Sequence, residues 1–234
     1  MPPTVVTTPL RQLAPGLWDV EQVRQMAGAN QRLRMTVVAL TGGGLWLYSP
    51  VEIDDELAQQ LAAVGNVAHV LAPNRYHHLF AGAAKRRYPA ASLWAVPGLP
   101  EKRADLRFDG VLEGEPSGLP WAGDLDTLVL TSVPRFSETV FFHRASRTLI
   151  CADLFFNIRT EQSFATRLVY RMLGVYGRPA QSWFFRRSID RRAIGPQLET
   201  ILAWDIQRIC MSHGDVLDEH AGAVLADVVA PFRR

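Results

Sequence analysis

Three short apolar segments rich in β-forming residues each end abruptly in polar side chains, and this pattern constrains the fold most strongly. Segments 67–71, 148–152 and 208–211 are followed by residues 74–78, by Asp153 and by residues 212–215. Short apolar runs bounded by turn residues are typical of buried strands. In α/β folds, functional side chains gather where strands end. We therefore predict an α/β protein whose functional site lies at these strand ends.

The segments around these strands fit the same class of fold. Segments 35–40 and 45–48 are predicted to form a hairpin through the glycine-rich turn 41–44. Asp54 is the expected N-cap of a helix that ends at Gly65. Further helices are predicted at 79–87, 198–204 and 219–229, further strands at 92–96, 126–131 and 139–143, and a surface connection at 97–123.

The composition is that of an ordinary globular chain. It has 234 residues, 48% of them hydrophobic, and 25 basic against 23 acidic side chains. This balance argues against nucleic acid as a partner, because a phosphate track requires a clear excess of basic residues. No segment approaches the roughly 20 apolar residues of a membrane span, and no signal-peptide pattern is present. We expect no transmembrane segment, a cytoplasmic location, and Cys151 and Cys210 as buried thiols.

Segment 159–192 differs from the rest because arginines alternate there with aromatic residues. We interpret it as a helical basic and aromatic insertion in a single domain spanning residues 1–234. It can serve as a lid, as the surface through which copies of the chain associate, or as a membrane-binding surface, since arginine pairs with phosphate and aromatic rings fill apolar space. The alternative, which we favour from the sequence, is that the aromatic residues pack on the fold or on a second copy and that the arginines form a solvated face.

The polar residues at the strand ends are of the types that bind metal ions. Imidazole nitrogens and a carboxylate that converge from different strands suit zinc or iron, provided that a coordination position stays open. Each histidine taken alone is better explained as a hydrogen-bond partner of the backbone. The metal interpretation therefore depends on the histidines and Asp153 lying together.

The order of elements resembles the metallo-β-lactamase fold. Segments 72–80, 138–149 and 152–157 are similar to a divergent family of that superfamily, DUF4336. The resemblance covers most of the chain, from about Leu13 to the final helix, and implies a four-layer αββα sandwich.

The resemblance also implies a reduced metal site. The superfamily motif His-x-His-x-Asp-His, laid on residues 74–79, places Asn74, Tyr76 and Leu79 where it has histidines, and His78 where it has aspartate. The superfamily's next histidine falls near Pro134. Asp153 and His213 match the bridging aspartate and the final histidine. The resemblance therefore implies at most one metal, zinc or iron, held by His78, Asp153 and His213, with His77 or Glu138 as a further ligand.

What the resemblance implies about function is hydrolysis of a small-molecule substrate. A bound metal activates water for attack on a carbonyl or phosphoester. Catalytic roles are expected for Asp153, His78 and Tyr76, while Arg75 and Arg135 are expected to bind substrate and stabilise the developing charge. The alternative is a non-catalytic binding or interaction protein that keeps the fold without metal. The sequence alone does not decide whether the chain is an enzyme.

Overall fold

The computed structural model describes residues 5–26, 29–113, 118–161 and 163–233. Parts of three predicted regions lie outside these residues: the ends of the expected domain, positions 114–117 of the surface connection and position 162 of the insertion. Within the described residues, no helix is both long and apolar enough to cross a membrane.

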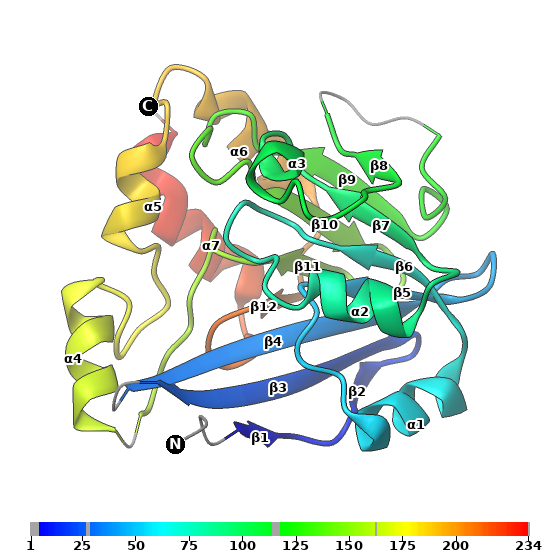
Figure 1. Ribbon diagram of the computed structural model, residues 1–234. Helices are drawn as coiled ribbons and strands as arrows, with labels where there is room; N and C mark the ends of the chain where they lie inside the picture. The colour runs from blue at the N-terminus through cyan, green and yellow to red at the C-terminus, as the bar shows by residue number, and fades with distance from the viewer. Residues whose placement is uncertain (1–4, 27–28, 114–117, 162, 234) are drawn as a thin grey trace.

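The first sheet is formed by the N-terminal half of the chain (Figure 1). Its strands are β1 (Val5–Thr7), β2 (Arg11–Ala14), β3 (Leu17–Met26), β4 (Ala29–Ala39), β5 (Leu45–Tyr48), β6 (Val67–Leu71), β7 (Ser92–Ala95) and β8 (Gly110–Val111). The order across the sheet is β1-β3-β4-β5-β6-β7-β8, and β2 pairs with β3. Strands β5 to β8 are mutually parallel, whereas the pairings among β1 to β5 are antiparallel.

The second sheet has the order β12-β11-β10-β9. Its strands are β9 (Leu125–Val129), β10 (Thr139–His143), β11 (Thr148–Cys151) and β12 (Arg208–Met211). Strands β11 and β12 are parallel, with Cys151 opposite Met211. The residues that follow these two strands therefore leave the sheet side by side.

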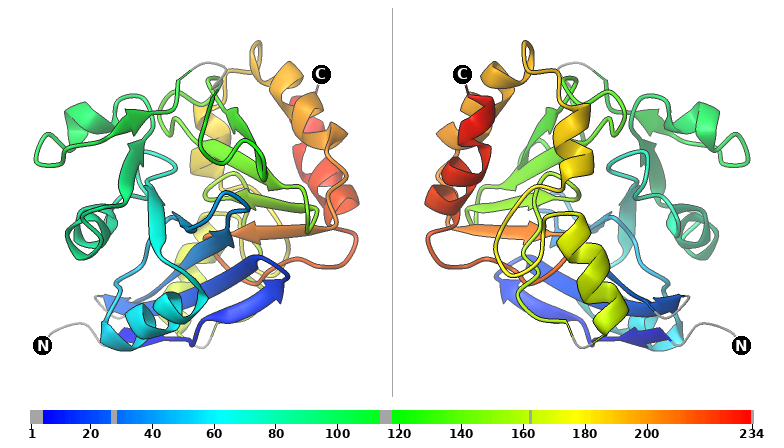
Figure 2. Two further views of the ribbon diagram at one scale, coloured as in Figure 1. Left: turned by 90° about the vertical axis from the view of Figure 1, so that its right-hand side faces the viewer. Right: turned by 90° about the vertical axis from the view of Figure 1, so that its left-hand side faces the viewer.

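Helices cover the outer faces of both sheets, as the two side views show (Figure 2). On the first sheet lie α1 (Asp55–Val64), α2 (Ala81–Arg87) and α3 (Leu99–Lys102), which share one apolar cluster with its strands. On the second lie α6 (Ile194–Ala203), α7 (Ala221–Val229) and the short helix η1 (Ala230–Phe232). The remaining helices are α4 (Phe164–Met172) and α5 (Trp183–Ser188). The predicted αββα layering is confirmed.

An aromatic core joins the two sheets. All four residues of β5 are buried: Leu45 and Leu47 face the outer helices, and Trp46 and Tyr48 face the second sheet. This alternation follows from the two-residue period of a strand. Trp46 meets Phe141 of β10 with ring centroids 4.8 Å apart in an edge-to-face arrangement, the geometry that aromatic rings prefer.

Local signals in the sequence predicted several elements closely. The Asp54 side chain accepts a hydrogen bond from the Leu57 N–H, and α1 ends at Gly65 as expected. Strand β10 has the predicted bounds, and β4 and β5 form the predicted hairpin. Helix α2 begins at Ala81 rather than at residue 79, because residues 74–80 form turns.

Candidate metal centre

The carboxyl ends of β6, β11 and β12 bring together polar residues from both sheets. Asn74 follows β6, Asp153 follows β11 and His213 follows β12. The Asn74 Nδ2 donates to Asp153 Oδ2 across 2.7 Å, which links the first sheet to the second at this point. The site thus lies where the strand ends were predicted to meet.

Three side chains converge closely enough to share one metal ion. His77, Asp153 and His213 each offer a ligand atom within 4.8 Å of the other two. The two imidazole Nε2 atoms are 3.0 Å apart. His77 Nε2 lies 3.5 Å from Asp153 Oδ2, and His213 Nε2 lies 3.6 Å from Asp153 Oδ1.

The opposite nitrogen of each imidazole is held by a hydrogen bond. His213 Nδ1 lies 2.8 Å from the Arg32 carbonyl oxygen, which can only accept, so Nδ1 carries the proton. His77 Nδ1 lies 2.8 Å from Ser49 Oγ. Ser49 directly follows β5 and has a φ of 53°, a strained conformation of the kind found at functional sites. These contacts aim both Nε2 atoms at the space beside Asp153.

The site is buried and its charges are coupled. Burial opposes the charged form of all three side chains. The Asp153 carboxylate outweighs burial at His77 and raises the pKa of that imidazole, while His77 in turn lowers the pKa of Asp153. At His213, burial and then the neighbouring His77 lower the pKa to about 4. His213 is therefore neutral at pH 7, and its Nε2 carries the lone pair that faces the His77 Nε2 at 3.0 Å.

Glu138 shapes the loop that carries Asp153 and is not one of the converging ligands. Its carboxylate accepts the backbone N–H groups of Ala152, Asp153 and Leu154 at 2.9, 3.0 and 3.1 Å. Burial and the Asp153 charge raise the pKa of Glu138 to about 7. The expectation that Glu138 is a further ligand is therefore corrected: its oxygens are already used by the backbone.

The structure brings His77, and not His78, to the cluster. Asn74 Oδ1 accepts the N–H groups of Tyr76 and His77, both at 2.8 Å, and this turn directs the His77 side chain inward. His78 points the other way, and its Nδ1 lies 3.0 Å from Arg103 Nη1. Burial and the nearby cations lower the pKa of His78. The expectation that His78 is the ligand and a catalytic residue is corrected by this one-residue shift.

The other predicted residues lie at different distances from the cluster. Tyr76 lines the adjacent cavity, where its ring lies against Phe136 with centroids 4.8 Å apart and the ring planes tilted by 50°. The Arg75 guanidinium lies against Gly98, and Arg135 is exposed. Neither arginine is among the residues that line the two cavities at the cluster, and their substrate-binding roles stay predictions.

Two cavities meet at the cluster. One has a volume of about 340 Å³ and is bordered by His77, Tyr76 and the 78–80 turn. The other has a volume of about 430 Å³ and extends toward α4 and α5. Asp153 and His213 line both. The second cavity has mostly apolar walls, formed by Phe136, Phe156, Val169, Tyr170, Leu173 and Phe184.

A buried ion-pair network, not expected from the sequence, supports the His213 loop. Arg34 of β4 is 3% exposed and pairs with Asp19 at 2.9 Å and Glu21 at 2.7 Å. The same guanidinium donates to the Gly214 carbonyl. Arg32 pairs with Glu21 at 3.0 Å, while its own carbonyl accepts from His213. Alternating charges along β3 and β4 are the sequence signal for this network.

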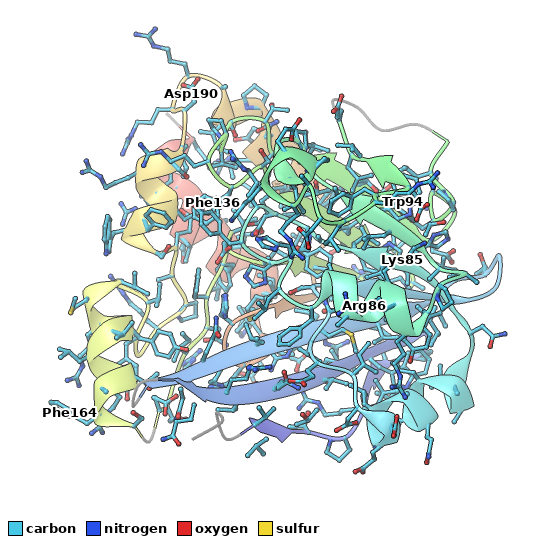
Figure 3. All side chains as sticks on the ribbon, in the orientation of Figure 1. Lys85, Arg86, Trp94, Phe136, Phe164 and Asp190 are labelled. Carbon is cyan, nitrogen blue, oxygen red and sulfur yellow. The ribbon has the colours of Figure 1, made fainter. Side chains whose placement is uncertain are left out.

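Segment 159–192 contains α4 and α5 beside the apolar cavity. Thr166 of α4 accepts the Asn30 N–H through its hydroxyl at 2.6 Å, which fixes α4 to the start of β4. Phe185 of α5 packs on Phe136 with ring centroids 4.9 Å apart. Phe136 lies beside α5 (Figure 3). The segment therefore forms one side of the site.

The donor set fits a single divalent metal ion. Two imidazoles and one carboxylate are a ligand set found for catalytic zinc and non-haem iron. The partners on both Nδ1 atoms are the outer contacts that metal-binding histidines generally make. A metal ion could replace the proton now shared between the two Nε2 atoms, since binding releases ligand protons.

Solved structures share this fold. A metallo-β-lactamase from Pontibacter korlensis aligns with a TM-score of 0.65 and 10% identity, over 99% of this chain and 100% of its own. One from Hirschia baltica aligns with a TM-score of 0.63 and 12% identity, over 100% and 99%. FIM-1 from Pseudomonas aeruginosa, solved in its mono-zinc form, aligns with a TM-score of 0.60 and 13% identity, over 99% and 96%. The chain therefore has the metallo-β-lactamase fold.

Sequence comparison identifies the family more narrowly. No curated protein matches the chain. The family model described as a domain of unknown function, DUF4336, matches residues 15–178. This range spans β3 to the loop after α4 and includes Asn74, His77 and Asp153. The chain belongs to the DUF4336 family.

Proposed function

We propose that this protein is a hydrolase that uses one metal ion, held by His77, Asp153 and His213, to cleave a small molecule with an apolar part. The observation that carries the proposal is the convergence of three ligand atoms within 4.8 Å, with the far nitrogen of both imidazoles already fixed by a hydrogen bond. Buried polar groups are costly unless they are hydrogen-bonded, and here the bonds that satisfy the cluster leave both Nε2 atoms directed toward Asp153.

Each residue of the centre has a distinct part in this proposal. A bound zinc or iron ion would supply Lewis acidity and a water molecule of lowered pKa. Asn74 holds Asp153 Oδ2 at 2.7 Å and so orients the carboxylate. The Arg32 carbonyl keeps the proton of His213 on Nδ1, which leaves Nε2 as a lone-pair donor.

The cavities indicate the class of substrate. The 430 Å³ cavity runs from Asp153 and His213 along the apolar walls beside α4. Apolar walls with a few convergent polar groups bind ligands that combine an apolar body with one polar group. We therefore propose an ester, thioester or amide whose acyl group occupies this cavity. Tyr76, which lines the other cavity, is placed to contact the remaining part of the substrate.

The experiment is a hydrolysis assay with p-nitrophenyl esters of increasing acyl length, using protein loaded with zinc and, separately, with iron. We expect kcat/KM to rise with acyl length, because each buried CH2 contributes about 0.8 kcal/mol. The Asp153→Asn variant should lose at least about 100-fold in kcat/KM, since it removes a ligand.

His220→Gln is the matched control, because His220 is an exposed histidine that lines neither of the two cavities at the cluster. It should retain activity within about threefold. Equal rates for wild type and Asp153→Asn on every ester would overturn the proposal. Equal rates for acetyl and decanoyl esters would overturn the assignment of the apolar cavity to the acyl group.

A further inference from the structure

Helix α4 presents large apolar side chains to solvent. Phe164 is 70% exposed, Leu168 48% and Met172 68%. These residues are spaced four apart, and at about 100° per residue they lie on one face of the helix. Phe164 points away from the sheets (Figure 3). An apolar stripe on a helix of a globular protein normally faces the core, so this one requires an explanation.

The outward direction of this face is fixed by contacts on the opposite side of α4. Thr166 and Tyr170, also four residues apart, are buried, and Thr166 accepts the Asn30 N–H. The helix cannot turn its apolar face inward without breaking these contacts. Its outer position at the edge of the molecule is clear in two orientations (Figures 1 and 2).

Arginines lie beside this apolar face, and Arg167 stacks over the Phe164 ring at 5.9 Å. Segment 159–192 has eight arginines and two acidic residues, Glu161 and Asp190. Arg171 and Arg178 are exposed, and Arg171 stacks over the Tyr176 ring at 5.2 Å. Trp183 at the start of α5 is 49% exposed. Exposed apolar side chains flanked by arginine, with an interfacial tryptophan, are the features that bind anionic membrane surfaces.

The same helix also forms a wall of the apolar cavity. Val169 directly follows the exposed Leu168, is itself 44% exposed and lines the cavity that reaches Asp153 and His213. The exposed face of α4 and the interior of the cavity are therefore contiguous at this residue. A surface that meets lipid at α4 would lie beside the cavity opening.

We propose that the face formed by Phe164, Leu168, Met172 and Trp183, with Arg171 and Arg178, docks on an anionic lipid surface. The net positive charge of the segment matches such a surface, and the apolar side chains are long enough to enter the headgroup region. The docking surface stands on observations separate from the metal ligands. It can therefore hold or fail independently of the hydrolase proposal.

The experiment is flotation of the full chain with vesicles of phosphatidylglycerol and, separately, of phosphatidylcholine. We expect binding to phosphatidylglycerol at low salt that is at least about tenfold stronger than to phosphatidylcholine, and that weakens as salt screens the arginines at about 0.5 M. Asp153→Asn should bind equally well, which separates this result from the metal centre.

Two pairs of variants test whether the apolar and the basic residues of this face contribute to vesicle binding. Met172→Asp should reduce vesicle binding at least about tenfold, whereas Val6→Asp, at a 61% exposed valine on β1, should not. Arg171→Glu should weaken binding, whereas Arg86→Glu on the exposed side of α2 should not.

Light scattering of the same proteins without lipid measures whether this face instead binds a second copy of the chain. Absence of binding to phosphatidylglycerol vesicles, or equal losses in Met172→Asp and Val6→Asp, would overturn the proposal. A wild-type dimer that Met172→Asp converts to a monomer would also overturn it, since the face would then be an interface between two copies of the chain.

Discussion

Gly214 follows the candidate ligand His213 at a point where two backbones nearly touch. Its φ is +95°, and a Cβ built at this position would lie 2.3 Å from the Asn157 carbonyl oxygen. Both the conformation and the space therefore require glycine. The close approach fixes the loop that presents His213, with the Asp215 N–H donating to the same Asn157 oxygen at 2.8 Å.

Replacing Gly214 with alanine should destabilise the protein more than the same change at Gly174. Gly174 also has a positive φ, +75°, but no atom of the described residues lies within 4 Å of the place that a Cβ would take there. Gly174→Ala should lower the free energy of unfolding by about 1–2 kcal/mol, because alanine is strained at a positive φ. Gly214→Ala should cost about 1–3 kcal/mol more, because the backbone must move. Urea unfolding measures both, and equal losses would contradict this account.

Some residues of the candidate metal centre can be predicted from the sequence and others cannot. Asp153 and His213 can be identified because each comes just after a buried strand. The alignment with the superfamily motif selects His78 as the ligand. The turn stabilised by the Asn74 side chain instead directs the preceding residue, His77, into the cluster. Ser49, which holds His77, is also at a strand end, but a lone serine carries no signal of a metal site.

At the scale of elements, the β3–β4 hairpin of the first sheet supports the His213 loop, which follows β12 of the second sheet. Both its polar face and its backbone contribute: Arg34 reaches the Gly214 carbonyl, and the Arg32 carbonyl accepts from His213. A hairpin whose charged residues pair with one another can stay ordered without an apolar partner on that face. The position of His213 therefore depends on this network.

Arg34→Gln should weaken both the fold and the metal centre. Removing one member of a buried ion pair costs up to about 3–5 kcal/mol, and here Asp19 and Glu21 each lose one of their two arginine partners. Loss of a supporting contact behind a ligand lowers metal affinity about 10–100-fold. Arg11→Gln is the control, since Arg11 pairs with the same Asp19 but is 60% exposed.

The control should cost about 0–1 kcal/mol of unfolding free energy and leave metal affinity unchanged. Urea unfolding of the metal-free proteins gives the first quantity, and competition with a zinc indicator gives the second. If Arg34→Gln bound metal as tightly as Arg11→Gln, the network would have no positioning role.

Elements with strong local signals are the ones that sequence can predict. The helix capped by Asp54 and the apolar strand β10 are located closely. Strands β1, β2 and β3 are not predicted, and β4 is placed only from residue 35. These segments contain many charged residues, which are unusual in buried strands. The charges are compatible with a strand because they pair across β3 and β4, and the sequence does not show that pairing.

At the scale of the whole molecule, the two sheets supply the ligand residues, and segment 159–192 forms one side of the site. The aromatic core around Trp46 and Phe141 joins the sheets rigidly. The three ligand residues come from both sheets, so the centre forms only when the sandwich is assembled. The predicted αββα architecture comes from a family resemblance, because no local pattern specifies how two sheets pack.

The overall charge balance conceals an uneven distribution. The chain has 25 basic and 23 acidic residues, yet eight of the arginines lie in segment 159–192. Sequence predicts a basic and aromatic segment there, but it does not show that Phe164 and Met172 face solvent while Tyr170 faces the cavity. That distinction depends on the contact between Thr166 and Asn30.

The most direct test of the central claim is the metal content of the purified protein, measured by mass spectrometry after loading with zinc or iron and removal of free metal. We predict about one equivalent per chain in wild type and in His78→Gln, and less than about one tenth in His77→Gln, Asp153→Asn and His213→Gln. Circular dichroism of the metal-free variants should show a folded sandwich in each case. A wild-type protein that binds no metal, or a His213→Gln variant that binds as much as wild type, would contradict the account.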